Sequence, residues 1–114
     1  MAARGNRPIE SYADFWPYYL QEHAKPSTRN LHVLGTGLAV ASAGAAAVLG
    51  EPWLVLGALA AGYGPAWLAH VFVEKNRPAT FDYPLWSLAS DFRMAGFWLS
   101  GRLETELERA GVPR

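Results

Sequence analysis

The sequence predicts an all-α fold, a small membrane protein made of a transmembrane helical hairpin with flanking interfacial and amphipathic helices. Two stretches, 31–50 and 52–73, contain no Asp, Glu, Lys or Arg. At a rise of 1.5 Å per residue, a run of about 20 residues reaches roughly 30 Å, the thickness of a bilayer hydrocarbon core. The alternative is two buried core helices, but a chain of 114 residues offers too little other surface to cover them. We therefore expect transmembrane helices at approximately 31–50 and 53–73.

The segment before the hairpin is aromatic and polar. Residues 11–23 carry five aromatic side chains, a density typical of the headgroup layer of a membrane. Ser11 and Asp14 are placed as a capping pair at the start of a helix, and Pro17 indicates either a kink or a late helix start. About 30 polar and aromatic residues precede the first apolar run, so we expect no signal peptide.

The hairpin is expected to turn at Glu51. Gly50 is suited to end the first helix, and Pro52 is tolerated in the first turn of the second. Small residues recur at every fourth position on both helices, as they do where membrane helices touch. They are Gly35, Ala39, Ala43 and Ala47 on the first helix, and Ala58, Gly62 and Ala66 on the second.

A further helix is expected after the hairpin. Apolar residues recur there at helical spacing, while Asp91 and Arg93 interrupt the run. This pattern predicts an amphipathic helix that lies on the membrane or against the hairpin, and it favours a third span less. The apolar positions are Leu85, Leu88, Phe92, Ala95, Leu99 and Leu103.

Basic residues lie on both sides of the hairpin, and none lies in its turn. By the positive-inside rule we expect an integral, multi-pass membrane protein with both termini in the cytoplasm and Glu51 on the other side. The basic residues are Arg4, Arg7, Lys25 and Arg29 before the hairpin, and Lys75, Arg77, Arg93, Arg102, Arg109 and Arg114 after it.

The composition excludes several classes of protein. Ten basic and ten acidic residues give a net charge of zero, which argues against a nucleic-acid partner bound through its phosphates. The chain has no cysteine, so disulfides, thiolate zinc sites and iron–sulfur clusters are excluded, and any metal must be held by nitrogen or oxygen. Motifs for nucleotide binding, serine hydrolysis and zincin proteolysis are absent from the sequence.

The three histidines of the chain are expected to meet. His32 precedes Glu51 by nineteen residues and His70 follows it by nineteen, so an antiparallel hairpin places both at one depth. A turn near Pro26 can bring His23 to the same place, where the helix dipole would favour its charged form. Imidazole is the commonest metal ligand among side chains, and three neutral imidazoles suit Fe(II), Zn or Cu. The alternative is that the histidines only pack or contact headgroups.

Other residues near this point are candidates for supporting roles. Glu74, one helical turn after His70, is a candidate to bind the metal or to orient a ligand, with an ion pair to a nearby base as the favoured alternative. Pro65 is expected to kink the second span, which either opens a cleft or serves packing. Bases at the membrane surface pair with lipid phosphates or with a substrate carboxylate. The candidate substrate-binding residues are Arg29, Lys75, Arg77, Tyr63 and Trp67.

Two stretches of the chain resemble the Mpo1-like family. They are FWPYYLQEHAKPSTRNLHVLGT (15–36) and AWLAHVFVEKNRPATFDYPLWSL (66–88). The first keeps two histidines nine residues apart, and the second keeps a histidine, a glutamate four residues later and a Pro-Ala pair. We expect the whole chain, 1–114, to form a single domain. The resemblance covers approximately residues 11–99 of it.

The resemblance implies an Fe(II)-dependent dioxygenase that cleaves 2-hydroxy fatty acids to the product one carbon shorter, as in lipid α-oxidation. It implies a fatty-acid substrate, O2 as the second substrate, and iron ligands at His23, His32 and His70. Two other classes remain open on the residues alone. One is a zinc-dependent lipid hydrolase on the same three nitrogens, and the other is a non-enzymatic small membrane protein. The oligomeric state is not determined by the sequence.

Overall fold

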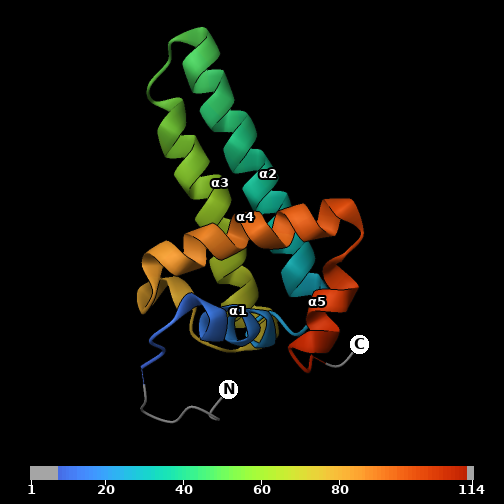
Figure 1. The fold of residues 1–114 in the computed structure, drawn as a ribbon. Helices are drawn as coiled ribbons and strands as arrows, with labels where there is room; N and C mark the ends of the chain where they lie inside the picture. The colour runs from blue at the N-terminus through green and yellow to red at the C-terminus, as the bar shows by residue number, and fades with distance from the viewer. Residues whose placement is uncertain (1–7, 113–114) are drawn as a thin grey trace.

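A long helical hairpin rises from a base of shorter helices in the computed structural model, which describes residues 8–112 (Figure 1). Within that range every regular element is helical, as the sequence predicts. The elements are α1 (Tyr12–Gln21), α2 (Pro26–Leu49), α3 (Leu54–Leu68), the π-helical segment η1 (Ala69–Glu74), the 3-10 turn η2 (Ala79–Phe81), α4 (Pro84–Ser100) and α5 (Leu103–Arg109).

The hairpin consists of α2 and of α3 continued by η1. Gly50 ends α2 in the left-handed conformation, with φ of 66°, which a residue with a Cβ rarely adopts. The first helix begins five residues earlier than predicted, because Pro26 occupies its first turn, where the missing N–H costs nothing. Both helices are long and apolar enough to cross a membrane, and only 22% and 17% of their most apolar windows are buried inside the chain.

The two hairpin helices pack closely at the base through small residues. A Cβ built on Gly35 would lie 2.7 Å from the carbonyl oxygen of Ala61, and one built on Gly62 would lie 3.5 Å from the Cβ of Ala39. Toward the tip, the prediction that every fourth residue of α2 lies in the helix contact is wrong. Ala47 is exposed, and Ala46 is buried instead. The reason is geometric. A four-residue step turns 40° beyond a full helical turn, so a stripe at every fourth position drifts around the helix.

The aromatic segment packs inside the protein. Ser11 caps α1 by accepting a hydrogen bond from the backbone amide of Asp14 at 3.3 Å, as predicted. Pro17 lies inside α1, so the alternative of a late helix start is wrong. The expectation of headgroup contacts is also corrected, because Phe15 and Tyr19 are fully buried in a core shared with α4 and α5.

Helix α4 lies across the hairpin where the hairpin meets the base (Figure 1). The predicted apolar stripe is exposed at its two ends, where Leu85 and Leu99 are 79% and 77% exposed. In its middle, Leu88 and Phe92 face the hairpin helices. Leu103 does not belong to the stripe: Gly101, with φ of 75°, ends α4, and Leu103 starts α5. Among the described residues two candidate spans are found, and α4 is not one of them.

Candidate metal centre

The three histidines converge at the base of the hairpin. The Nε2 of His32 lies 2.7 Å from that of His23 and 3.2 Å from that of His70, and the remaining pair is 3.1 Å apart. All three side chains are buried. Among the described residues, these three form the group of side chains that could hold a metal ion.

Local structure brings each histidine to this point. His32 is the seventh residue of α2, where that helix packs on the second half of the hairpin. His23 lies in the turn between α1 and α2, and the guanidinium of Arg29 closes that turn by donating to the carbonyls of His23 and Ala24 at 2.9 and 2.8 Å. His70 lies on η1, and π-helical turns of this kind are frequent at functional sites.

In each ring the far nitrogen is Nδ1, the one that points away from the other two histidines. Hydrogen bonds at this nitrogen set the tautomers of two of the rings. The Nδ1 of His23 donates to the backbone carbonyl of Tyr19 at 2.6 Å. The Nδ1 of His70 donates to Oδ1 of Asn76 at 2.6 Å, because the amide group of Asn76 is turned toward two oxygens of Glu22. A neutral imidazole carries one proton, so both rings direct an Nε2 lone pair at the same point.

This donor set fits a divalent metal. A metal 2.0–2.1 Å from each nitrogen would separate the nitrogens by about 2.9 Å at right angles and about 3.3 Å at tetrahedral angles. The three observed separations, 2.7, 3.1 and 3.2 Å, fall close to that range. Fe(II), Zn and Cu are all suited to imidazole nitrogen, so the donor set by itself leaves the identity of the metal open.

Electrostatics favour the neutral, ligating form of His23. Its pKa is lowered well below the usual value, first by burial and then by the neighbouring His32 and His70. We expected the dipole of the preceding helix to favour the charged form, and this is wrong. Removal from water and two adjacent imidazoles outweigh the partial charge of a helix end.

Asp91 is a site residue that the sequence analysis did not assign. Its Oδ1 accepts a hydrogen bond from the hydroxyl of Tyr19 at 2.5 Å and lies 3.5 Å from the Nδ1 of His32. Burial raises its pKa to about 6, while the hydrogen bond from Tyr19 acts in the opposite direction. The sequence did contain one signal for Asp91, a charged residue within the apolar run of α4. A charged side chain is rarely buried unless it has a partner, so such a residue indicates a polar contact.

Glu74 lies apart from the histidine group. Its carboxylate Oε2 accepts from the backbone amide of Lys25 at 2.6 Å, and the side chain of Lys25 donates to the carbonyl of Val73 at 2.9 Å. Glu74 therefore makes neither the predicted metal contact nor the predicted ion pair. Its hydrogen bond joins the end of η1 to the turn before α2.

The candidate substrate-binding bases separate into buried and exposed residues. Arg29 is buried and its guanidinium binds two turn carbonyls, which corrects the expectation that it meets lipid phosphates. Arg77 is exposed, pairs with Asp82 at 3.2 Å and lies 5.1 Å from the ring of Phe81. Lys75 is exposed at the end of η1. A substrate role for any of the three stays a prediction.

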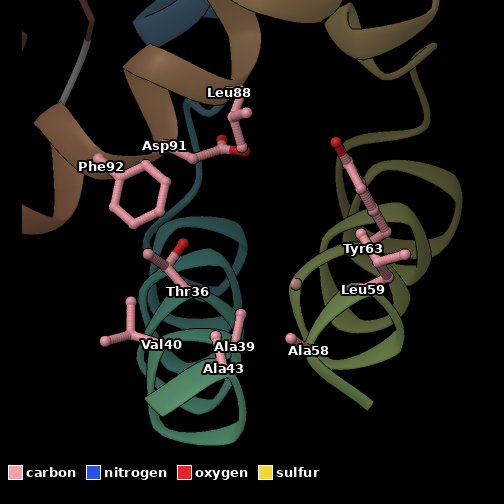
Figure 2. A pocket seen from close by; sticks show the side chains of 11 residues that line it. Thr36, Ala39, Val40, Ala43, Ala58, Leu59, Tyr63, Leu88, Asp91 and Phe92 are labelled. Atoms are coloured by element: carbon pink, nitrogen blue, oxygen red, sulfur yellow. The ribbon is translucent and has the colours of Figure 1, made fainter. Parts of the chain in front are cut away.

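An apolar pocket of about 250 Å³ lies beside the site, between α2, α3 and α4 (Figure 2). Asp91 lies at its α4 end, and Ala43 and Ala58 lie toward the hairpin tip (Figure 2). Of the two predicted aromatic contacts, Tyr63 lines the pocket. The full lining is Thr36, Ala39, Val40, Ala43, Ala58, Leu59, Gly62, Tyr63, Leu88, Asp91 and Phe92.

Trp67, the second predicted aromatic contact, and Pro65 of the second span are not part of this pocket's lining, and a substrate role for Trp67 stays a prediction. The ring of Trp67 lies 5.0 Å from that of Phe81 and 5.3 Å from that of Tyr63. Pro65 lies in α3 with its Cγ 3.7 Å from the position of a Cβ built on Gly35. Of the two alternatives for Pro65, the structure agrees with packing, because its ring lies against α2 at Gly35.

Comparison with known proteins gives one family. A family model described as "Mpo1-like: 2-hydroxy-palmitic acid dioxygenase Mpo1-like" matches residues 9–103, which is most of the chain and includes all three histidines. No curated protein and no solved structure matches.

Proposed function

The chain belongs to the Mpo1-like family, and from this premise we propose that it is an Fe(II)-dependent dioxygenase that cleaves 2-hydroxy fatty acids to acids one carbon shorter. The observation that carries the proposal is the convergence of three buried Nε2 atoms within 2.7–3.2 Å. His23, His32 and His70 would hold the metal. Three protein nitrogens leave coordination positions open for other ligands, as oxygenases of the non-haem type require.

The reaction balances without a further reductant. With the removed carbon leaving as carbon dioxide, the acid RCH(OH)CO2H and O2 give RCO2H, CO2 and water. The substrate loses four electrons and O2 accepts four. Bound iron would supply the redox chemistry with O2, while the protein supplies position and electrostatics.

The chain's own groups would prepare the site. Tyr19 and Asn76 hold His23 and His70 in the tautomer that leaves Nε2 unprotonated. Arg29 would position His23 indirectly, because its guanidinium donates to the backbone carbonyls of the turn that carries His23. Burial of the three rings keeps bulk water from the metal positions.

We assign the apolar pocket to the hydrocarbon tail of the substrate. The pocket reaches Asp91, whose carboxylate lies next to the His32 ring, so it adjoins the metal site. Its volume of about 250 Å³ is just below the range of roughly 300–1,000 Å³ typical of ligand pockets. A long tail would therefore extend beyond it along the exposed apolar face of the hairpin.

Metal analysis and oxygen uptake test the function. We expect anaerobically purified protein to contain stoichiometric iron and to consume O2 when 2-hydroxypalmitic acid is added. Palmitic acid, which lacks the hydroxyl, is the matched control and should cause no uptake. Longer 2-hydroxy acids should be used in preference to shorter ones, because each buried methylene contributes roughly 0.8 kcal/mol. Stoichiometric zinc would instead support a lipid hydrolase, and protein without metal would support a non-enzymatic role.

We also propose that the hairpin crosses a membrane with both termini in the cytoplasm. The two described ends of the chain lie at the base, away from Glu51 (Figure 1). Large apolar side chains are exposed along the hairpin, including Leu34, Val48, Leu56 and Phe72. Three of the basic residues that predict the orientation, Arg4, Arg7 and Arg114, lie outside the described residues.

Cysteine labelling tests this topology directly, since the chain has no native cysteine. In intact cells, Glu51→Cys at the hairpin tip should react with a membrane-impermeant maleimide. Thr105→Cys, exposed on α5, is the matched control and should react only after the membrane is opened. Labelling of Thr105→Cys from outside would reverse the proposed orientation, and a protected Glu51→Cys would argue against a full crossing.

A further inference from the structure

His32 differs from the other two histidines in its far nitrogen. The Nδ1 atoms of His23 and His70 each have an acceptor at 2.6 Å. Within residues 8–112, the buried Nδ1 of His32 has no hydrogen-bond partner, and the Oδ1 of Asp91 lies 3.5 Å away. A ring that binds metal through Nε2 carries its proton on Nδ1, so this nitrogen needs an acceptor in the loaded site.

The side chain of Asp91 is held next to this nitrogen. Its side chain is only 14% exposed, and the hydroxyl of Tyr19 donates to the same Oδ1 that faces His32. Tyr19 is itself fully buried, and its backbone carbonyl accepts from His23. Tyr19 of α1 therefore contacts His23 directly and holds the carboxylate that faces His32.

We propose that Asp91 is the positioning residue of His32: its carboxylate accepts the Nδ1–H of His32 when a metal is bound at Nε2, and Tyr19 holds the carboxylate for this purpose. The inference rests on the proposed metal site. A closure of about 0.5 Å would bring the pair to hydrogen-bond distance. A carboxylate at the far nitrogen fixes the ring and makes it a more basic ligand, and its loss typically lowers metal affinity 10–100-fold.

The test is a Co(II) titration of metal-free, full-length protein, followed by visible absorption and by thermal unfolding. Asp91→Ala should bind Co(II) 10–100-fold more weakly than the wild type, with shifted absorption bands. Asp91→Asn keeps the size and an acceptor oxygen but loses the charge, so its affinity should fall between the two. Tyr19→Phe keeps the backbone carbonyl that serves His23 and should weaken binding less than Asp91→Ala.

The same two helices offer a matched control. The hydroxyl of Tyr12 on α1 hydrogen-bonds to Ser90 on α4 at 2.8 Å, one residue away from Asp91. Tyr12→Phe and Ser90→Ala each break a contact between α1 and α4 that does not involve the histidines. Both should leave Co(II) affinity and the absorption bands at wild-type values, even if the unfolding temperature falls.

The outcomes separate this inference from the proposed function. If wild-type protein binds Co(II) and the Asp91 and Tyr19 variants bind it as tightly as the Tyr12 and Ser90 variants do, Asp91 is only structural and the inference is overturned. If wild-type protein binds no metal, both the inference and the proposed metal site are overturned. Graded weakening confined to Asp91 and Tyr19 supports the inference, whatever substrate the enzyme uses.

Discussion

In His70→Ala, we expect bound metal and substrate-dependent oxygen uptake to be lost together. The substitution removes one of three nitrogens that meet within 3.2 Å, and the effect should exceed the 10–100-fold typical of groups that only orient a ligand. His23→Ala and His32→Ala should behave alike. Metal content by elemental analysis and oxygen uptake by electrode measure both losses.

Thermal unfolding separates loss of the site from loss of the fold. A metal at 100 times its Kd stabilises the folded state by about 2.7 kcal/mol, so added Fe(II) should raise the Tm of the wild type and leave that of His70→Ala unchanged. Glu74→Gln is the matched control, because Glu74 is one turn further along and lies outside the histidine group. Its metal content should match the wild type. Metal loss in Glu74→Gln with retention in His70→Ala would contradict the proposed ligand set.

The second large effect is expected for Gly35→Ala. A Cβ at this position would lie 2.7 Å from the carbonyl oxygen of Ala61, and neither backbone can move aside without parting the two helices. Overpacking of this kind typically costs about 1–3 kcal/mol. His32 lies one turn before Gly35, so the same displacement should move it away from His70 and weaken metal binding.

Gly37→Ala is the matched control on the same helix. A Cβ there has no neighbour within 4 Å, and alanine is the better helix former by about 1 kcal/mol, so its Tm should not fall. Thermal unfolding in detergent and Co(II) titration compare the pair. Equal stability and equal metal affinity in both variants would show that close approach at Gly35 does not hold the site together.

Much of the site could be predicted because it follows from regular geometry. Equal spacing of His32 and His70 from the hairpin turn places them at one depth in any antiparallel hairpin, and their Nε2 atoms lie 3.2 Å apart. The groups behind the rings could not be predicted in this way. Asn76 lies just past the end of η1, and Asp91 reaches the site from a helix that crosses the hairpin, so no periodic pattern relates them to the histidines.

By itself, the sequence determined the all-helical fold, two apolar helices long enough to cross a membrane, their turn and the meeting of the three histidines. These features could be predicted because the distribution of charges and the helical repeat can be read from the sequence without knowing how the helices pack. Only the tertiary structure decided what each polar group contacts. Arg29 closes a turn instead of facing lipid, and Asp91 joins Tyr19 across 72 residues of sequence. Such partners depend on which faces of distant helices are pressed together, because a buried polar group must find its hydrogen bond wherever packing places one.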